Sequence, residues 1–536
     1  MPSWDHEVDV VVLGSGGAAL AAALTAAASG ASVAVYDKAA TVGGTTAVSG
    51  GVVWIPAHKR SPDGELTVDD ALSYLRAQSL GSMDDALVNT FVRTGPAMLD
   101  FIEAHSSLRF EIATGFPDYK PELPGGQPGG GRSLSAAPFD LNQLGEWRDR
   151  ITSFPQDWSN VGFDAETRAR LHAGVDQNAD LCVAGTALIA GLLKGLLDAG
   201  VIPHTDARAE ELIAEDGAIV GVRIASGGEQ LAVRARRGVI LGTGGFEWDP
   251  ALVNTFLRGP MHGAVSPPNN TGDGLRMAMA HGADLANMGE AWWVPIVQIP
   301  GDTIDGHQRS RSVRLERTRP RSIIVNRLGK RFVNEACDYN SMAGAFHYLD
   351  PRAGYVNDPA WMVFDAQHLK RYGFLGVDPD GPVPDWFCES ADLTELAAKT
   401  GIAVDGLTRT IDAWNHHVGD GADPDFGRGS SAYDGYWGDE HATTLAGKTL
   451  GPVDTAPFYA VPVSVGAMGT KGGPRTDRDG RVLHVSGAPI PGLFAAGNAM
   501  GGVTGRAYGG AGGTIGPAMV FGYRAGYAAA TGKSVD

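Results

Sequence analysis

The hydrophobic pattern at the start of the chain predicts a βαβ unit. The β-branched run over residues 8–13 is typical of a buried parallel strand. Glycines follow at once, and an alanine-rich stretch predicts a helix that ends at Gly30. A second apolar run, ASVAVYDK over residues 31–38, predicts the next strand, which ends in Asp37. A strand, a glycine loop, a helix and a second strand in this order indicate a parallel α/β sheet.

The loop of this unit has the spacing of a dinucleotide-binding fingerprint. Gly14, Gly16 and Ala19 occupy the positions of G-x-G-x-x-G/A, and Asp37 lies 18 residues beyond Ala19. The glycines let the backbone approach a pyrophosphate, whose charge is favoured at the N-terminus of a helix. The acid suits a ribose hydroxyl, so we expect a dinucleotide at this loop.

Three further loops of small residues favour FAD over a nicotinamide cofactor. TVGGTTAVSGG spans residues 41–51, GTGG spans 242–245 after an apolar run, and a long glycine cluster spans 497–516. A glycine loop directly after the ribose-binding acid suits a long flavin cofactor. Because both ends of the chain supply such loops, we expect the FAD-binding domain to be discontinuous.

The middle of the chain differs from its flanks and is richer in Pro, Trp, His and Asp. Within it, residues 319–339 predict two strands joined by a turn at RLGK, and residues 393–418 predict two amphipathic helices. We therefore expect an α/β protein with a Rossmann-type FAD-binding domain and an inserted α+β catalytic domain. The predicted boundaries are 1–290 and 469–536 for the first domain and 291–468 for the second.

Composition narrows the function classes. The 536 residues carry a formal net charge of −18, which argues against a nucleic-acid binder. Three distant cysteines give neither a disulfide framework nor zinc spacing, so we expect no metal site. The N-terminus lacks a basic leader pattern, and no apolar run reaches the length of a membrane span. We expect a cytoplasmic protein and leave a peripheral membrane contact open.

The order of motifs resembles the 3-ketosteroid Δ1-dehydrogenases, a family of the flavoprotein group that contains the fumarate reductases. The resemblance covers nearly the whole chain. It rests on GSGGAAL at 14–20, VGGTTAVSGG at 42–51, FPDYK at 116–120, GRS at 131–133, VNRLGKRFVNEACDY at 325–339, GTKGGPRTD at 469–477 and GLFAAGNAMGGVTGRAYGGAGGTIGPAMVFGY at 492–523. It implies an enzyme that uses FAD to remove two hydrogens from C1 and C2 of a 3-oxosteroid A-ring and passes the electrons to an external acceptor.

The resemblance also implies the site. Catalytic roles fall on Tyr119, Tyr339, Tyr508 and the backbone of Gly512, and the substrate pocket includes Val52 and Phe116. In this hypothesis the Tyr508 hydroxyl and the Gly512 N–H polarise the ketone, and Tyr339, supported by Tyr119, takes the α-proton. The hydride then goes to flavin N5. The expected FAD contacts are Gly14, Ser15, Gly16, Gly17, Ala18, Asp37, Lys38, Gly43, Gly44, Thr45, Thr46, Ser49, Gly50, Gly51, Arg208, Thr243, Gly244, Gly245, Asp273, Gly497, Asn498, Gly513, Thr514 and Ile515.

Three alternatives remain open from the sequence. A dicarboxylate reductase needs a His and an Arg where this chain has Thr504 and Tyr508, and Arg506 is out of register. A Δ4-(5α)-dehydrogenase or a desaturase of smaller cyclic ketones is the second alternative. The Y-x-G-x-G segment at Tyr508 and the pair of Tyr119 and Tyr339 favour Δ1 chemistry, and Gly509 and Ala511, which stand where the Δ1-dehydrogenases usually have prolines, weaken that preference. A flavoprotein that only carries electrons is the third.

One segment is strongly basic, although the chain as a whole is acidic. Residues 309–321 contain six arginines, which predict either a solvated loop or an anion contact near the mouth of the substrate site. The anion would be a substrate carboxylate, a coenzyme A tail or an anionic lipid. Residues 145–180 match the family weakly, which predicts a different substrate entrance.

Overall fold

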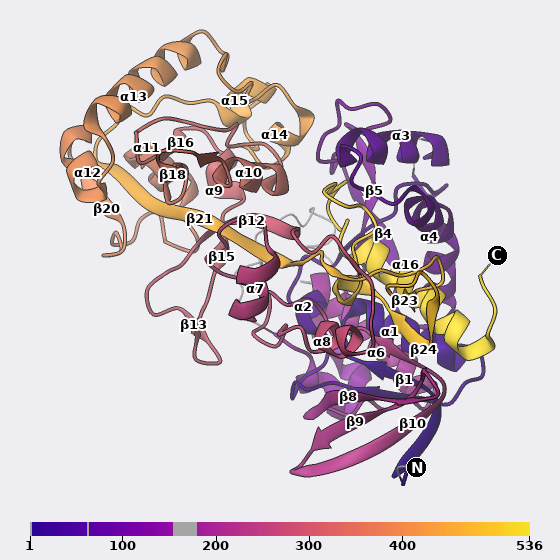
Figure 1. Cartoon of the computed structure of the whole chain (residues 1–536). Coiled ribbons are helices and arrows are strands. Elements are labelled where there is room, and N and C mark those ends of the chain that lie inside the picture. Colours follow the sequence, from indigo (N-terminus) through magenta and orange to yellow (C-terminus); the bar gives the residue numbers. More distant parts are fainter. Residues whose placement is uncertain (1–2, 62–63, 154–178, 536) are drawn as a thin grey trace.

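A parallel sheet carries the N-terminal loop. The computed structural model describes residues 3–61, 64–153 and 179–535. Strand β1 (His6–Leu13) lies between β2 (Val33–Tyr36) and β10 (Glu229–Leu241), and β24 (Pro489–Ala495) continues the sheet in parallel. Figure 1 labels β1, β10 and β24 of this sheet. Antiparallel β23 (Arg481–Leu483) closes this edge. Within the apolar run of β1, Val10 to Leu13 are buried because helices and strands surround them, as the sequence predicts, whereas Val8 and Asp9 are partly exposed.

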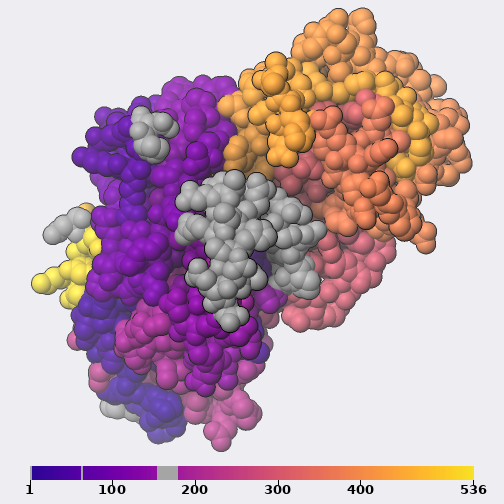
Figure 2. All heavy atoms as spheres, turned by 180° about the vertical axis from the view of Figure 1, so that it is seen from behind, coloured from indigo at the N-terminus to yellow at the C-terminus, as the bar shows by residue number. Residues whose placement is uncertain are grey.

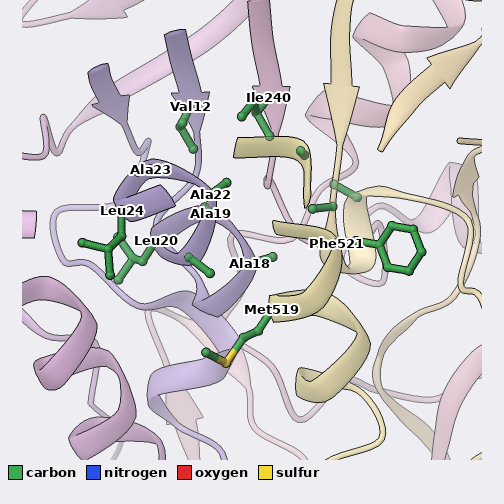
Figure 3. Packing of buried hydrophobic residues seen from close by; sticks show 14 of the residues in the cluster. Val12, Ala18, Ala19, Leu20, Ala22, Ala23, Leu24, Ile240, Met519 and Phe521 are labelled. Carbon is green, nitrogen blue, oxygen red and sulfur yellow. The ribbon is translucent and has the colours of Figure 1, made fainter. Parts of the chain in front are cut away.

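Two helices rich in small residues bring the chain ends together. Helix α1 (Gly17–Ala28) packs along α16 (Ile515–Thr531), beneath Val12 of β1 (Figure 3). A Cβ added to Gly526 would lie 2.3 Å from the carbonyl oxygen of Ala22, so the two backbones touch. This close approach places the C-terminal glycine cluster beside the N-terminal loop.

Replacing Gly526 by leucine is expected to lower the free energy of unfolding by about 1–3 kcal/mol, because the side chain overpacks this contact. Thermal unfolding of the purified protein would measure the loss. The control is Gly419→Ala, at the end of another helix, where an added Cβ meets nothing within 4 Å. Equal melting temperatures for the two variants would contradict the close packing.

Further elements surround the first sheet. A second, three-stranded sheet has the order β3 (Val52–Trp54), β5 (Gly130–Ala136) and β4 (Phe110–Thr114). The antiparallel strands β8 (Ala207–Glu215) and β9 (Ala218–Ser226) extend from β10. The remaining elements are α2 (Gly44–Ala47), α3 (Val68–Ser79), α4 (Asp85–His105), α6 (Ala184–Asp198), α7 (Pro250–Phe256), α8 (Asp273–Ala280), β6 (Phe139–Asp140), β7 (Leu181–Cys182), β11 (Leu285–Ala286), β22 (Gly473–Pro474), η1 (Leu141–Arg150) and η2 (Gly497–Ala499).

A separate antiparallel sheet lies between residues 291 and 470. Its order is β15 (Arg311–Ser312), β12 (Ala291–Val297), β21 (Phe458–Thr470), β19 (Ala360–Asp365) and β16 (Ser322–Asn326), and β20 (Cys388–Ser390) also pairs with β21. Figure 2 shows this region from behind as an orange lobe beside the violet N-terminal half. Its remaining elements are α9 (Leu315–Thr318), α10 (Tyr339–Phe346), α11 (Ala366–Tyr372), α12 (Leu393–Thr400), α13 (Val404–Gly419), α14 (Ala432–Tyr436), α15 (Leu445–Thr449), β13 (Thr303–Ile304), β14 (His307–Gln308), β17 (Leu349–Asp350) and β18 (Gly354–Tyr355).

The expectations for this region are confirmed in part. The two predicted amphipathic helices are α12 and α13, and the first predicted strand is β16. The second predicted strand is wrong, because after the turn only a single bridge joins Val325 to Arg331. The Arg331 guanidinium instead pairs with Glu335 at 2.7 Å and with Asp423 at 2.8 Å, and this buried ion network takes the place of a strand ladder.

Within the described residues, no helix is both long enough and apolar enough to span a bilayer.

Candidate active site

One cavity of about 870 Å³ joins the glycine loops to the second sheet. Nearly all the expected FAD contacts line it, as do the three tyrosines, Gly512, Val52 and Phe116. Among the expected contacts, Gly43, Gly245 and Gly513 do not line the cavity, and Arg208 lines a smaller neighbouring pocket. The structure therefore brings together residues that are up to 500 positions apart in the chain.

The N-terminus of α1 opens into this cavity. Gly16 caps the helix without a side-chain hydrogen bond, and Gly17 and Ala18 of the first turn line the cavity wall. Gly14 has a φ of 99°, and a Cβ there would lie 2.3 Å from the carbonyl oxygen of Gly242. Backbone N–H groups at a helix start, reached over a glycine turn, suit a pyrophosphate.

Charged groups mark the far end of the cofactor region. Asp37 lines the cavity and accepts a 2.5 Å hydrogen bond from the Ser15 hydroxyl, and burial raises the pKa of its carboxyl. Asp273 pairs with Lys38 at 2.9 Å and with Arg208 at 3.1 Å. A helix start at the cavity wall, a buried acid and hydroxyl donors form a set of groups that fits a dinucleotide, so these residues can hold FAD.

A polar pair behind the second glycine loop, over residues 41–51, was not predicted from the sequence. Asn270 donates to Thr45 Oγ1 at 2.9 Å and to Glu247 Oε1 at 2.7 Å. Glu247 is buried, and its pKa is raised by burial. This pair fixes the loop at Thr45. No sequence motif links Glu247 to Asn270, so their contact could not be predicted from the sequence.

Three tyrosines from distant segments meet at the other end of the cavity. Tyr119 lies in the loop after β4, Tyr339 begins α10, and Tyr508 lies in the loop before α16. The hydroxyls of Tyr119 and Tyr339 are hydrogen-bonded, and Tyr339 donates to the Tyr508 hydroxyl at 3.1 Å. The Asp338 carboxylate caps α10 by accepting from the Ser341 N–H, which fixes where Tyr339 starts. The sequence predicted this grouping of the three residues.

The hydrogen bonds leave two donors for a ligand oxygen. Tyr508 accepts from Tyr339 and, at 3.1 Å, from the Thr514 hydroxyl, so its own proton is available to an acceptor in the cavity. Within the described residues, nothing accepts a hydrogen bond from the N–H of Gly512. Gly512 has a φ of 89°, and an added Cβ would lie 2.4 Å from the carbonyl oxygen of Val52. Only glycine fits there.

Burial controls the protonation of the three phenols. It raises the pKa of Tyr119 and Tyr339 well above the usual value of 10, and it raises the pKa of Tyr508. The bond from Tyr119 works in the opposite direction on Tyr339, because a donated hydrogen bond stabilises the phenolate. Of the two partners in this bond, Tyr339 is therefore the better candidate for a base.

A buried ion pair holds the loop that carries Tyr119. Asp118 accepts from the Arg132 guanidinium at 2.6 Å and from the Trp54 indole N–H at 2.9 Å. Both ions are nearly inaccessible to solvent. The FPDYK and GRS motifs contain these residues, but the sequence did not show that they bind one another.

Replacing Asp118 by leucine is expected to destabilise the fold by about 3–5 kcal/mol, because Arg132 then stays buried without its partner. The double variant with Arg132→Leu is expected to recover much of this loss. Urea unfolding of the two variants and the wild type measures the difference. A double variant no more stable than Asp118→Leu would contradict a paired role.

The loop that carries Tyr508 is anchored from several sides. The carbonyl oxygen of Gly509 accepts from the Tyr119 N–H at 3.0 Å and from the Tyr74 hydroxyl at 2.7 Å. A Cβ at Gly509 would lie 2.4 Å from the ring of Trp54. The glycine that departs from the family pattern is thus matched to a tryptophan packed against it.

A lysine that the sequence analysis gave no role supports the same loop. Lys471 is 1 % exposed, and its ammonium donates to the carbonyl oxygens of Gly505 at 3.1 Å and Ala507 at 3.0 Å. It lies 4.0 Å from the ring centroid of Trp292, whose ring meets Tyr508 edge-on. Burial lowers the pKa of Lys471 to about 7. In the sequence, Lys471 lies in the GTKGG motif, which belongs to the segments that resemble the family but does not predict what the lysine contacts.

Thr504, which stands where a dicarboxylate reductase needs a His, and the out-of-register Arg506 take no part in the cavity wall. The Thr504 hydroxyl donates to the carbonyl oxygen of Ala507 at 3.0 Å, and Arg506 pairs with Glu290 at 3.0 Å. Neither Thr504 nor Arg506 lines the large cavity.

The arginine-rich segment over residues 309–321 is not a solvated loop. Arg317 is fully buried and donates to the carbonyl oxygens of Val313 and Cys337. Four of the six arginines, Arg309, Arg311, Arg314 and Arg319, line the large cavity. Of the weakly matching stretch at 145–180, residues 154–178 lie outside the described residues.

Known proteins share this sequence and fold over nearly their whole length. A family model described as "FAD binding domain" matches residues 9–515. The chain is 43 % identical to 4-oxocyclohexanecarboxylate 2-dehydrogenase of Sinomonas cyclohexanicum, covering 97 % of this chain and 92 % of that protein. It is 40 % identical to 3-oxosteroid 1-dehydrogenase of Mycolicibacterium smegmatis, covering 97 % and 96 %.

A solved structure agrees closely with the fold. The crystal structure of 3-ketosteroid delta1-dehydrogenase from Sterolibacterium denitrificans, in complex with 1,4-androstadiene-3,17-dione, superimposes with a TM-score of 0.92. The two chains are 33 % identical, and the match covers 98 % of this chain and 100 % of that one.

Proposed function

Because the chain belongs to the family of FAD-dependent ketone dehydrogenases that includes 3-oxosteroid 1-dehydrogenase, we propose that it dehydrogenates the A-ring of 3-oxosteroids between C1 and C2. The observation that carries the proposal is the group of three hydrogen-bonded tyrosines in one cavity with the FAD loops. Residues 1–290 and 469–536 bind FAD in this proposal, and residues 291–468 cover the substrate.

The ketone oxygen is the first group that the site must bind. A hydrogen α to a ketone is a very weak acid, and its removal needs a place for the developing enolate charge. The Tyr508 hydroxyl and the Gly512 N–H are the donors that supply it, and both belong to the cavity wall. Donors held in place before the reaction stabilise this charge with little reorganisation.

The α-proton of the ketone is the second group on which the site must act. Tyr339 takes it as a phenolate, a form in which it no longer donates to Tyr508, and the hydroxyl of Tyr119 stabilises this phenolate by donating a hydrogen bond. The aromatic wall around them, with Phe116 stacked on Tyr436 at 4.3 Å between centroids, excludes water and suits a flat apolar ring. When bound, FAD supplies the hydride acceptor, and the electrons leave it for an external acceptor.

Smaller cyclic ketones are a second candidate substrate class. The relative with 43 % identity is named for a cyclohexanone carboxylate. A six-membered ring with one ketone presents the same reacting atoms as a steroid A-ring, so the tyrosines serve both substrates in the same way.

Anaerobic reduction of the flavin by androst-4-ene-3,17-dione tests the proposal. The expected result is loss of the flavin absorbance and a product two hydrogens lighter with a C1–C2 double bond. Reduction by cyclohexanones but not by the steroid would move the function to the second candidate. If no cyclic ketone reduces the bound flavin, the proposed function is wrong.

A further inference from the structure

A buried lysine links the end of the antiparallel sheet between residues 291 and 470 to the loop that carries Tyr508. Lys471 directly follows β21, and its backbone N–H donates to the carbonyl oxygen of Glu290 at 2.9 Å, just before β12 begins. Its own carbonyl oxygen accepts from the Gly502 N–H at 2.8 Å. The backbone of Lys471 is therefore fixed on both sides, and its side chain extends from this fixed point.

The ammonium of Lys471 uses all three of its N–H donors on one turn of this loop. Its nitrogen lies 3.1 Å from the carbonyl oxygen of Gly505, 3.4 Å from that of Arg506 and 3.0 Å from that of Ala507. In the part of the chain that the structure describes, no other donor reaches the carbonyl oxygen of Gly505. Because three carbonyl dipoles that converge on one point repel one another, the cation stabilises the turn that immediately precedes Tyr508.

The positive charge of Lys471 is buried without a direct ion pair. The carboxylates of Glu290 and Asp338 attract it, and the side chains of Arg258 and Lys120 repel it. Glu290 is itself paired with two arginines, and no carboxylate among the described residues forms an ion pair with the ammonium. A buried cation without an ion pair is costly, so we expect a role beyond filling the space.

The ammonium also lies behind the phenol that would bind the ketone. It is 4.0 Å from the ring centroid of Trp292 and 5.8 Å from that of Tyr508, and the two rings meet edge-on at 4.7 Å. The Trp292 indole N–H donates to Asn498 Oδ1 at 3.0 Å, which fixes the ring between the cation and the phenol. Lys471 does not line the large cavity, so it can act on a ligand there only through its neighbours.

We propose that Lys471 is a positioning residue for the dehydrogenation. Its ammonium holds the turn at residues 505–507 and the Trp292 ring so that the Tyr508 hydroxyl meets the ketone oxygen, and it places a positive charge behind that hydroxyl. This inference rests on the proposed function, because it assigns Tyr508 the ketone oxygen. It follows that Lys471 affects the reaction only while Tyr508 has its hydroxyl.

A double-mutant cycle with Tyr508→Phe tests this dependence. Lys471→Met removes the ammonium with little change in side-chain length, and the FAD-loaded variants are mixed anaerobically with androst-4-ene-3,17-dione at about pH 6. Burial lowers the pKa of Lys471 to about 7, so the wild-type lysine is largely protonated there. We expect Lys471→Met to slow flavin reduction about 10–100-fold while the steroid Kd changes less than about threefold. Beside Tyr508→Phe, the same replacement should cost less than about threefold.

Arg524→Met is the matched control. Arg524 is another buried cation away from the cavity wall, where it donates to the carbonyl oxygen of Arg478 and pairs with Asp479 at 2.8 Å. A loss of rate that comes only from a weakened fold should have the same factor with and without the Tyr508 hydroxyl.

The carbonyl stretching frequency of bound 1,4-androstadiene-3,17-dione provides a readout that does not depend on turnover. Infrared difference spectra of the FAD-loaded proteins are expected to show a lower frequency in the wild type than in Lys471→Met, because a well-placed donor polarises the carbonyl group. This difference should disappear when both proteins also carry Tyr508→Phe.

Two results would overturn the inference. Flavin reduction at the wild-type rate in Lys471→Met would show that the ammonium does not act on the reaction. A loss as large beside Tyr508→Phe as in its absence would show that the lysine does not act through this hydroxyl. If Lys471→Met yields no folded holoenzyme, Lys471→Gln, which keeps two N–H donors without the charge, enters the same cycle and is judged in the same way. A wild-type flavin that neither the steroid nor cyclohexanones reduce would instead refute the proposed function.

Discussion

Replacing Tyr339 by phenylalanine is expected to slow anaerobic flavin reduction by roughly 10²–10⁴-fold, the contribution typical of a positioned base. The phenylalanine ring fills the same space in the cluster, where the rings of Tyr119 and Tyr508 lie 5.2 and 5.5 Å away. The loss should therefore appear in the rate of reduction and not in substrate binding. Stopped-flow absorbance at varied ketone concentration separates the two.

The pH dependence of this step identifies the base. Burial raises the pKa of Tyr339 well above 10, so the phenolate fraction increases with pH across the whole neutral and alkaline range. The wild-type rate of reduction is expected to rise steadily up to about pH 10, and this rise should disappear in Tyr339→Phe. Tyr433→Phe is the control. It removes a hydroxyl from the same aromatic cluster, and this hydroxyl is hydrogen-bonded to none of the three tyrosines.

A different outcome would reassign the base. If Tyr339→Phe keeps the pH-dependent rise while Tyr119→Phe loses it, Tyr119 takes the proton. An effect of equal size in Tyr433→Phe would mean that the variants disturb the packing of the cluster and that no single hydroxyl is responsible.

The sequence predicted those elements of the fold whose conformation depends on residues close together in the chain. The strand at 8–13, the loop at Gly14 and the helix after it follow from local propensity and from φ values that only glycine adopts easily. The contact between α1 and α16 could not be predicted in this way, because each helix alone shows only a run of small residues. Their meeting depends on Gly522 and Gly526 fitting against the backbone of a segment 500 residues away.

The same limit applies to the site. The resemblance grouped Tyr119, Tyr339 and Tyr508, because whole motifs carry them. The Asp118–Arg132 pair lies within two of those motifs, yet pairing is a property of the folded chain and not of either motif. The strand predicted after the turn at RLGK is wrong, and of the two interpretations of residues 309–321 the solvated loop is wrong, whereas the anion contact stays a prediction. Arg331 and Arg317 are buried against Asp423 and Cys337, partners that a local pattern of residues does not reveal.

Tyr508→Phe is expected to lower the rate of flavin reduction by roughly 10²–10³-fold, because it removes one of the two donors to the ketone oxygen. Unlike loss of the base, this change should keep the rise of the rate with pH, because Tyr339 still ionises while the donor to the ketone oxygen is missing. The rate should therefore stay below that of the wild type at every pH from neutral to alkaline. Flavin reduction and exchange of α-deuterium from the ketone into water measure the two steps.

Thr514→Val provides a graded comparison for the same donor. The Thr514 hydroxyl donates to the Tyr508 oxygen at 3.1 Å, and this bond makes the phenol a better donor to a third group. Its loss is expected to slow reduction less than Tyr508→Phe does and to leave the shape of the pH profile unchanged. If Tyr508→Phe reduces flavin at the wild-type rate, the ketone is held elsewhere. In that case the N–H of Gly512 would not bind the ketone together with Tyr508, although both groups line the same cavity wall.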